Sequence, residues 1–170
     1  MAHRTLKQCV DDLLAVGQMV RIDEQVDAHL EIAEIQRRVF AAGGPALYFA
    51  NVKGCRFSMV GNLFGTMERL RYIFRDSLEG LKRVVRLGTN PAEILAQPRM
   101  HLKTPWYALY ARPRKVRGGP VLKNEISIDC LPQLVSWPDD GGAYITLPQV
   151  YTEAPAQPGL MHSNLGMYRV

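Results

Sequence analysis

Apolar residues recur at helical spacing in four segments of the first half of the chain. Apolar positions three or four residues apart lie on one face of a helix, which can then be buried. The pattern predicts helices at residues 5–16, 30–42, 66–74 and 77–87. The stripe expected to enter the core in the last two helices consists of Leu70, Phe74, Leu78, Leu81 and Val85.

Short runs rich in β-branched and aromatic residues predict strands. Three runs lie between the helices, at residues 19–22, 46–49 and 57–61. Three more follow one another near the end of the chain, at residues 121–128, 144–152 and 165–170. Asn90 and Pro91 are an N-cap and a first-turn proline, so a short helix is expected to run to about Ala96.

The amino-acid composition changes between the two halves of the chain, because Pro, Gly and basic residues dominate residues 112–120. We therefore predict an α+β fold with an N-terminal α/β region at 1–111, a basic connection at 112–120 and a strand-rich region at 121–170. The last predicted strand reaches Val170 and leaves an unfinished sheet edge. We expect the polypeptide to continue beyond this point.

Composition indicates a globular protein, with 170 residues of which 47% are hydrophobic. The sequence has no apolar run near the ~20 residues needed to span a bilayer, and its start has no signal-peptide core. We expect a cytoplasmic protein. Cys9, Cys55 and Cys130 are far apart and form no CxxC pair, so we expect reduced, mostly buried thiols and neither a disulfide framework nor a zinc site.

The formal net charge of +5 raises the question of a nucleic-acid partner. Two basic clusters fall on predicted helices with apolar stripes, and we interpret them as solvated helix faces. The third lies in the connection. This distribution favours a small anionic ligand, such as a phosphate or an aromatic carboxylate, over nucleic acid. The clusters contain Arg69 and Arg71; Lys82, Arg83 and Arg86; and Arg112, Arg114, Lys115 and Arg117.

Residues 164–169, Asn-Leu-Gly-Met-Tyr-Arg, contain the most informative polar groups. An amide oxygen such as that of Asn164 suits Mg²⁺ or Mn²⁺, and the guanidinium of Arg169 suits a carboxylate or phosphate. An ideal strand places these two side chains on opposite faces, unless a bulge or bend at Gly166 turns them to one site. From the residues alone, a turn asparagine and a surface arginine remain the alternative.

Other candidates are weaker. Asp139 and Asp140 lie in a Pro- and Gly-rich turn, where they could bind metal or transfer protons, although carboxylates that cap the turn explain them equally well. His162 precedes Asn164 by two residues and is either a ligand or an exposed loop histidine. The remaining histidines, His3, His29 and His101, lie in unrelated segments and are interpreted as incidental.

Seven segments in order along the chain carry a resemblance to a known family: 30–35, 42–47, 61–66, 117–120, 131–132, 137–146 and 164–169. Together they resemble the UbiD family of prenylated-FMN-dependent decarboxylases. The resemblance covers essentially the whole chain. It implies that residues 121–170 begin a split β-barrel that binds the flavin, and that the whole protein reversibly decarboxylates an aromatic or α,β-unsaturated carboxylic acid. A 4-hydroxybenzoate-type quinone precursor is the expected substrate class.

The resemblance also implies roles for individual residues. Asn164 would help to hold a Mn²⁺ or Mg²⁺ ion that bridges to the cofactor phosphate. The backbone after it would line prenylated FMN, with a K⁺ ion near its first carbonyl, and Arg169 would belong to the catalytic network. Thr146 would lie near the substrate pocket. The full cofactor-binding set is Asn164, Leu165, Gly166, Met167, Tyr168 and Arg169.

In the family, the other metal ligands and the catalytic glutamates follow this motif, so we expect residues 1–170 alone to be inactive. The leading interpretation is the N-terminal part of such a decarboxylase, homo-oligomeric at full length. A non-catalytic stand-alone module, or an accessory subunit of a complete decarboxylase, is the alternative. An unrelated basic binding domain is the third.

Overall fold

The computed structural model describes residues 3–89, 106, 109 and 116–170. Its N-terminal part consists of α1 (Leu6–Ala15), β1 (Met19–Val26), α2 (Glu31–Ala41), β2 (Ala46–Val52), β3 (Met59–Gly61), α3 (Met67–Ile73) and α4 (Leu78–Thr89). The later part has two strands, β4 (Gln149–Glu153) and β5 (Ser163–Met167), and three short 3₁₀ turns, η2 (Pro120–Lys123), η3 (Ile128–Cys130) and η4 (Leu160–His162).

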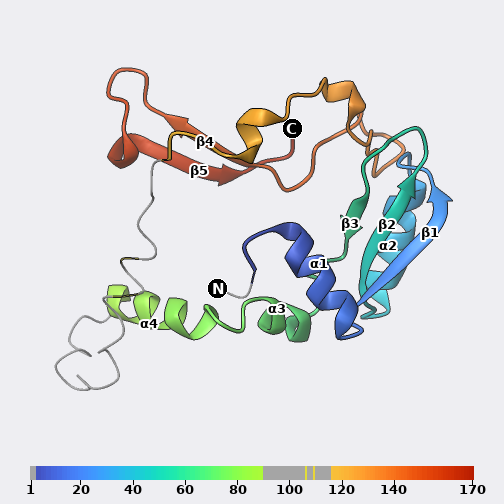
Figure 1. Cartoon of the computed structure of the whole chain (residues 1–170), viewed down its shortest axis with the longest axis horizontal. Coiled ribbons are helices and arrows are strands. Elements are labelled where there is room, and N and C mark those ends of the chain that lie inside the picture. Colours follow the sequence, from blue (N-terminus) through green and yellow to red (C-terminus); the bar gives the residue numbers. More distant parts are fainter. Residues whose placement is uncertain (1–2, 90–105, 107–108, 110–115) are drawn as a thin grey trace.

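A three-stranded sheet in the order β1-β2-β3 organises the N-terminal part (Figure 1). β1 runs parallel to β2, with α2 as the connection, and β2 pairs antiparallel with β3. Parallel neighbours require such a crossover, whereas the antiparallel pair needs only a turn. Thr5 is the N-cap of α1, and its hydroxyl accepts a hydrogen bond from the Gln8 N–H at 3.2 Å.

Alternate residues of β2 enter two cores on opposite faces of the sheet. Ala46 belongs to a cluster that also contains Leu13 of α1 and Ile73 of α3. Phe49 belongs to a second cluster that contains Ile32 of α2. Phe49 and Leu13 have no exposed surface. The period-2 alternation of a strand therefore places helices on both faces of a small sheet.

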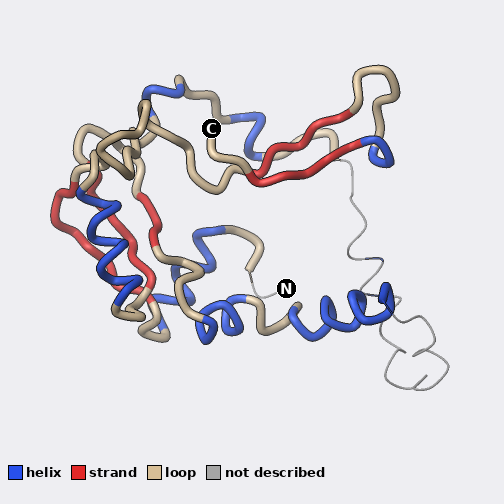
Figure 2. Tube along the Cα trace, turned by 180° about the vertical axis from the view of Figure 1, so that it is seen from behind, coloured by secondary structure: helices blue, strands red, loops and turns tan. Residues whose placement is uncertain are grey.

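The later part of the chain returns to the end of the N-terminal sheet, beyond the last residues of β1 and β2, before it forms a hairpin. We call residues 128–137 the strap. Its Val135 forms a parallel bridge with His29, and the Val135 carbonyl accepts a hydrogen bond from the Leu30 N–H at 2.9 Å. Beyond the strap, β4 and β5 form an antiparallel hairpin that projects away from the sheet (Figures 1 and 2).

The strand predictions are partly confirmed. The strand predicted at 121–128 is wrong, because Pro120–Lys123 forms a 3₁₀ turn and another begins at Ile128. The predicted strand 144–152 begins later, at Gln149, after Leu147 adopts a positive φ of 60°. The predicted strand 165–170 ends at Met167. The short helix predicted after Asn90 lies outside the described residues.

The helices predicted at 5–16, 30–42, 66–74 and 77–87 are found where they were predicted, but the burial of their side chains differs. In the stripe assigned to the core, Phe74, Leu81 and Val85 are 41%, 60% and 57% exposed. Arg69, assigned to a solvated helix face, is only 3% exposed. Cys9 is buried as expected, whereas Cys130 is exposed. None of the described helices is long and apolar enough to cross a bilayer.

Candidate functional site

Arg169, the predicted catalytic residue, is held by two groups from the turn after the strap. Its Nη2 lies 2.6 Å from Oδ1 of Asp140. Its guanidinium carbon lies 3.7 Å from the centre of the Tyr144 ring, a cation–π contact. About half of the Arg169 side chain remains exposed. The geometry fixes the direction of the guanidinium while part of it stays accessible.

Asp140 combines two roles. Its Oδ2 accepts hydrogen bonds from the N–H groups of Ser136 and Trp137, each at 3.1 Å, so it caps the turn as the sequence suggested. Its other oxygen binds Arg169. The hydrogen bond from Arg169, supported by those two backbone N–H groups, holds the pKa of the Asp140 carboxyl below its usual range. The carboxylate therefore stays charged and keeps the arginine in place at neutral pH.

Tyr168 folds back over β5 and contacts Asn164, the predicted metal ligand. The Asn164 amide nitrogen donates to the Tyr168 hydroxyl at 3.3 Å. This arrangement requires glycine at position 166, because a Cβ there would lie 2.5 Å from Cε2 of the Tyr168 ring. Asn164, Gly166 and Tyr168 thus share one face of the strand, as period-2 geometry requires.

The predicted motif does not close into one site through a bulge. Pairing between β4 and β5 is continuous from Gln149 opposite Met167 to Glu153 opposite Ser163, so Gly166 lies in regular strand. Asn164 contacts Tyr168, whereas Arg169 contacts Asp140 and Tyr144. Residues 164–169 therefore present two separate polar groups, one at each end of the motif.

Backbone pairing extends past the hairpin and brings Thr146 alongside the motif. The Ile145 and Val170 backbones exchange hydrogen bonds of 2.6 and 3.2 Å, and the Tyr168 N–H donates to the Pro148 carbonyl. Thr146 lies within this paired segment and is exposed. His162 is also exposed, at the end of a 3₁₀ turn.

The residues fit the implied cofactor and metal in part. The Asn164 contact uses the amide nitrogen, which leaves the oxygen, the atom that a hard divalent cation prefers, without a hydrogen bond to another described residue. Arg169 supplies a cation for an anionic group. No cluster of three or more His, Cys, Asp or Glu residues occurs in the described part of the chain. Asn164 could therefore contribute one ligand to a metal site, and the others must come from elsewhere.

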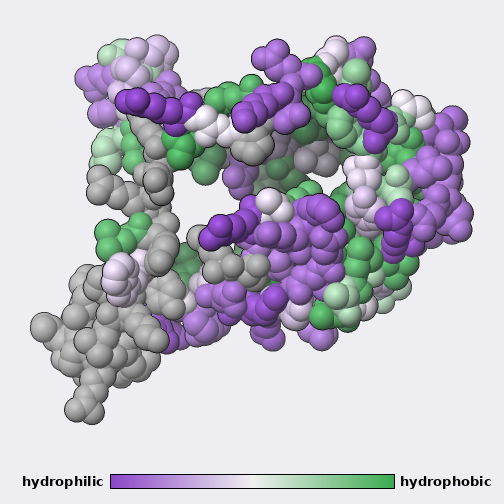
Figure 3. Space-filling model, in the orientation of Figure 1, coloured by the Kyte–Doolittle hydropathy of each residue, from purple (hydrophilic) through white to green (hydrophobic). Residues whose placement is uncertain are grey.

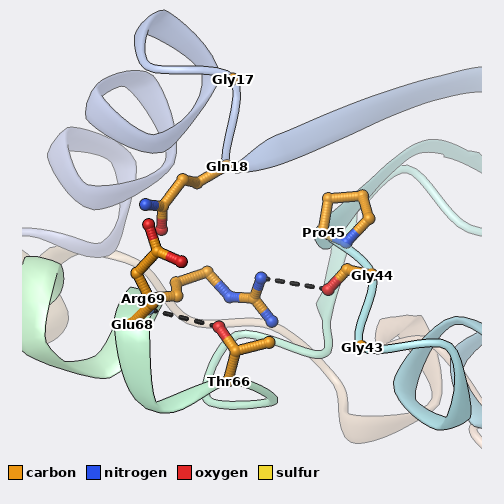
Figure 4. Close-up of a pocket in the computed structure, with 8 residues that line it drawn as sticks. All are labelled: Gly17, Gln18, Gly43, Gly44, Pro45, Thr66, Glu68 and Arg69. Atoms are coloured by element: carbon orange, nitrogen blue, oxygen red, sulfur yellow. Dashed lines mark hydrogen bonds between the residues drawn. The ribbon is translucent and has the colours of Figure 1, made fainter.

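A second polar centre lies in the N-terminal part, where buried Arg69 binds three carbonyls of two backbone segments. Its Nη1 donates to the Gly44 carbonyl at 3.2 Å, its Nη2 to the Asn62 carbonyl at 2.7 Å and its Nε to the Leu63 carbonyl at 3.0 Å. Figure 4 shows the guanidinium reaching from α3 toward Gly44. Both residues line a hollow of about 320 Å³. Burial lowers the pKa of the Arg69 guanidinium.

Asn62 and Gly65 complete this centre. Asn62 has a positive φ of 52°, and its amide nitrogen donates to the Pro45 carbonyl at 2.9 Å. A Cβ on Gly65 would lie 1.9 Å from Oδ1 of Asn62, so only glycine fits. Since these Arg69 side-chain bonds all end on backbone carbonyls, the segments 42–47 and 61–66 are structural. The sequence reasoning missed this role, although Asn62 and Gly65 both lie in a segment that carries the family resemblance.

Comparison with known proteins agrees with the fold. Residues 10–88 match the family described as 3-octaprenyl-4-hydroxybenzoate carboxy-lyase N-terminal domain. Residues 114–170 match the family described as 3-octaprenyl-4-hydroxybenzoate carboxy-lyase Rift-related domain. Together the two matches cover most of the chain, in the order in which the structure places them.

Curated relatives are similar along nearly the whole chain. A protein of Chlamydia trachomatis serovar D is 41% identical over 98% of the chain, which spans 29% of that relative. A protein of Chlamydia pneumoniae that is named as a subunit of 4-hydroxybenzoate decarboxylase is 41% identical over 90% of the chain, and the match covers 26% of its length. The chain thus spans less than a third of the length of these curated relatives.

Solved structures share the fold. Vanillic acid decarboxylase of Sedimentibacter hydroxybenzoicus, in its open form, is 25% identical with a TM-score of 0.68 over 99% of this chain and 36% of its own. HmfF of Pelotomaculum thermopropionicum, in complex with prenylated FMN, is 23% identical with a TM-score of 0.66 over 98% of this chain and 35% of its own. With both of its parts matched in order, the chain belongs to the UbiD family and corresponds to an N-terminal portion of it.

Proposed function

We propose that the chain is the N-terminal part of a decarboxylase that uses prenylated FMN, with an aromatic or α,β-unsaturated carboxylic acid as substrate. A 4-hydroxybenzoate-type acid is the preferred class. The observation that carries the proposal is the position of Arg169. It closes the ordered family motif, and Asp140 and Tyr144 hold it with about half of its side chain exposed.

Arg169 would bind the carboxylate of the substrate. A guanidinium has five N–H donors in a planar fork, and the short 2.6 Å contact with Asp140 is made by Nη2. The donors that remain can pair with a second carboxylate in the bidentate geometry that arginine favours. Asp140 and Tyr144 would act as positioning residues, because they limit the directions that the guanidinium can take.

The cofactor would lie along the motif from Asn164 to Tyr168. Bound prenylated FMN would supply the electron sink for the electron pair left when CO₂ departs. Asn164 would offer its amide oxygen to Mn²⁺ or Mg²⁺, and backbone carbonyls near Leu165 would face K⁺. Gly166, which admits no side chain beside Tyr168, lets the Tyr168 ring lie against this stretch of backbone.

We further propose that other polypeptide segments complete the β4–β5 hairpin into the family's split barrel. A two-stranded hairpin is marginally stable by itself in water. The exposed fractions of Tyr151, Leu165 and Met167 are 49%, 63% and 62%. Hydrophobic residues of the hairpin lie at the surface (Figure 3). The missing metal ligands and general acid would come from the same segments. Residues 1–170 alone would then be inactive, and the full-length protein would be a cytoplasmic homo-oligomer.

The test is to isolate the native protein from the cells that make it and to measure its intact mass and its bound flavin. A mass well above 19.1 kDa, bound prenylated FMN and CO₂ release from 4-hydroxybenzoate-type acids are the expected results. A native protein of 19.1 kDa that binds no flavin would contradict the proposal and would favour the non-catalytic module. Co-purification with a separate flavin-bearing decarboxylase would favour the accessory subunit instead. In Chlamydia pneumoniae the similar protein is itself named as a subunit.

A further inference from the structure

Two cysteines from distant parts of the sequence meet where the strap contacts the end of the N-terminal sheet. Cys55 lies in the turn between β2 and β3, and Cys130 lies in the 3₁₀ turn at the start of the strap. The Cys55 sulfur is 3.3 Å from the backbone carbonyl oxygen of Cys130. Both are free thiols in the structure. The fold thus brings together two thiols that are 75 residues apart in the sequence.

The two residues are close enough for a disulfide to form after a local rearrangement. Since Cα–C and C=O bonds are about 1.5 and 1.2 Å, the 3.3 Å contact places the Cys55 sulfur at most about 6 Å from the Cα of Cys130. In a disulfide, a sulfur lies at most about 4.5 Å from the Cα of the opposite cysteine, so the remaining gap is no more than about 2 Å. Rotation of the exposed Cys130 side chain, with a small shift of the strap, can bring the two sulfurs into bonding distance.

The contact is held in place by the docking of the strap. Val135 exchanges backbone hydrogen bonds with Ala28 and Leu30, at 3.2 and 2.9 Å. Leu134 packs against the core cluster that contains Phe49, and Cys55 packs against the same cluster. Both cysteines therefore belong to segments anchored to one core, so their proximity does not depend on an isolated loop.

We propose that Cys55 and Cys130 form an oxidisable pair, whose disulfide covalently fastens the strap to the N-terminal sheet. Metal binding explains the pair less well, because no third His, Cys, Asp or Glu joins it among the described residues. The proposal is independent of the decarboxylase assignment. The disulfide would nevertheless restrict the residues around Arg169, since the strap leads directly into the turn that carries Asp140 and Tyr144.

The reaction is a two-step thiol–disulfide exchange with a small disulfide such as oxidised glutathione. The thiolate of Cys130, the more exposed partner, attacks the glutathione disulfide and releases one glutathione thiolate. The thiolate of Cys55 then attacks the sulfur of Cys130 in this mixed disulfide and releases the second. Two protein thiols lose two electrons and two protons, and one glutathione disulfide becomes two thiols.

The test uses the full chain incubated with oxidised glutathione. The expected product is a monomer lighter by about 2 Da, from the loss of two hydrogens. A non-reducing tryptic digest should contain the peptide of residues 54–56 joined to that of residues 124–169. Cys9, only 6% exposed, is the internal control and should react with a thiol reagent only after unfolding. A Cys9→Ser variant should therefore show the same mass loss.

Two variants and a structural readout complete the experiment. Cys55→Ser should stop the reaction at a glutathione adduct on Cys130, and Cys130→Ser should abolish the cross-link. In the oxidised wild-type chain, hydrogen exchange at the amides of Leu30 and Val135 should be slower than in the reduced chain. Separate glutathione adducts on wild-type Cys55 and Cys130, a disulfide-linked dimer or a cross-link that includes Cys9 would each overturn the proposal.

Discussion

Replacing Arg69 with methionine tests whether the buried guanidinium holds the N-terminal part together. Methionine keeps an unbranched apolar side chain but removes the bonds to the carbonyls of Gly44, Asn62 and Leu63. Three charge-assisted hydrogen bonds at about 1.5 kcal/mol each amount to roughly 4–5 kcal/mol. The substitution also removes the free-energy cost of burying a charge, which offsets part of this sum. Gly44 and Asn62 also keep other donors, the Asn62 side chain and the Gly65 N–H.

The expected net loss for Arg69→Met is therefore about 2–4 kcal/mol in the free energy of unfolding. Urea denaturation followed by circular dichroism measures it as a lower midpoint at unchanged slope. Arg71→Met is the matched control, since Arg71 is an exposed arginine on the same helix, and it should change stability by less than about 0.5 kcal/mol. Equal effects of the two substitutions would refute the assignment of Arg69 as a structural centre.

Three further predictions concern glycine and charge. Gly166→Ala should displace the Tyr168 ring and break the contact of Tyr168 with Asn164, which NMR should detect as chemical-shift changes at both residues. The control Gly118→Ala, where a Cβ meets open space, should leave the chemical shifts of Asn164 and Tyr168 unchanged. Arg169→Met should raise the pKa of Asp140 toward its usual range in a ¹³C carboxyl titration; an unchanged pKa would contradict the ion pair. Hydrogen bonds from Arg37, then Arg38, lower the pKa of Glu34 to about 2. The contribution of these ion pairs to the free energy of unfolding should be complete above pH 4.5 and should fade as the pH falls toward 2. Replacement of both arginines should abolish this pH dependence.

Much of the N-terminal fold could be predicted because its determinants are local. Helical spacing and caps such as Thr5 are encoded within a few residues of each other, and the alternation in β2 assigns its side chains to two faces. The strand predicted at 121–128 failed because β-propensity is realised only when a partner strand offers hydrogen bonds. At Pro120 the chain instead enters a 3₁₀ turn.

Burial was harder to predict, because it depends on contacts between distant segments. Arg69 is buried because Gly44, 25 residues earlier, brings a carbonyl to it, and no local pattern encodes that meeting. Phe74, Leu81 and Val85 belong to the apolar stripe that the spacing predicted, yet all three are exposed. Periodicity identifies the apolar face of a helix, but it does not identify the segment that would cover this face.

For the candidate site, too, local features could be predicted from the sequence and contacts between distant segments could not. The family motif pointed to Asn164 and Arg169, and the capping role of Asp140 followed from its turn. The contact between Asp140 and Arg169 joins two separate segments and could not be inferred from spacing. The regular strand at Gly166 also left the two ends of the motif separate, where the sequence allowed a bulge. The cofactor, metal and substrate roles of these residues stay predictions.

The most direct test of the central claim is carboxyl exchange by the native protein, loaded with prenylated FMN and Mn²⁺. Incubation with ¹³C-bicarbonate and a 4-hydroxybenzoate-type acid should place ¹³C in the carboxyl group of that acid. Arg169→Lys, which loses the bidentate fork, should reduce the rate of exchange by about 10²-fold or more, whereas the control Arg117→Lys should leave it unchanged. No exchange by the flavin-loaded wild-type protein with any aromatic or α,β-unsaturated acid, or equal rates for Arg169→Lys and the wild type, would contradict the account.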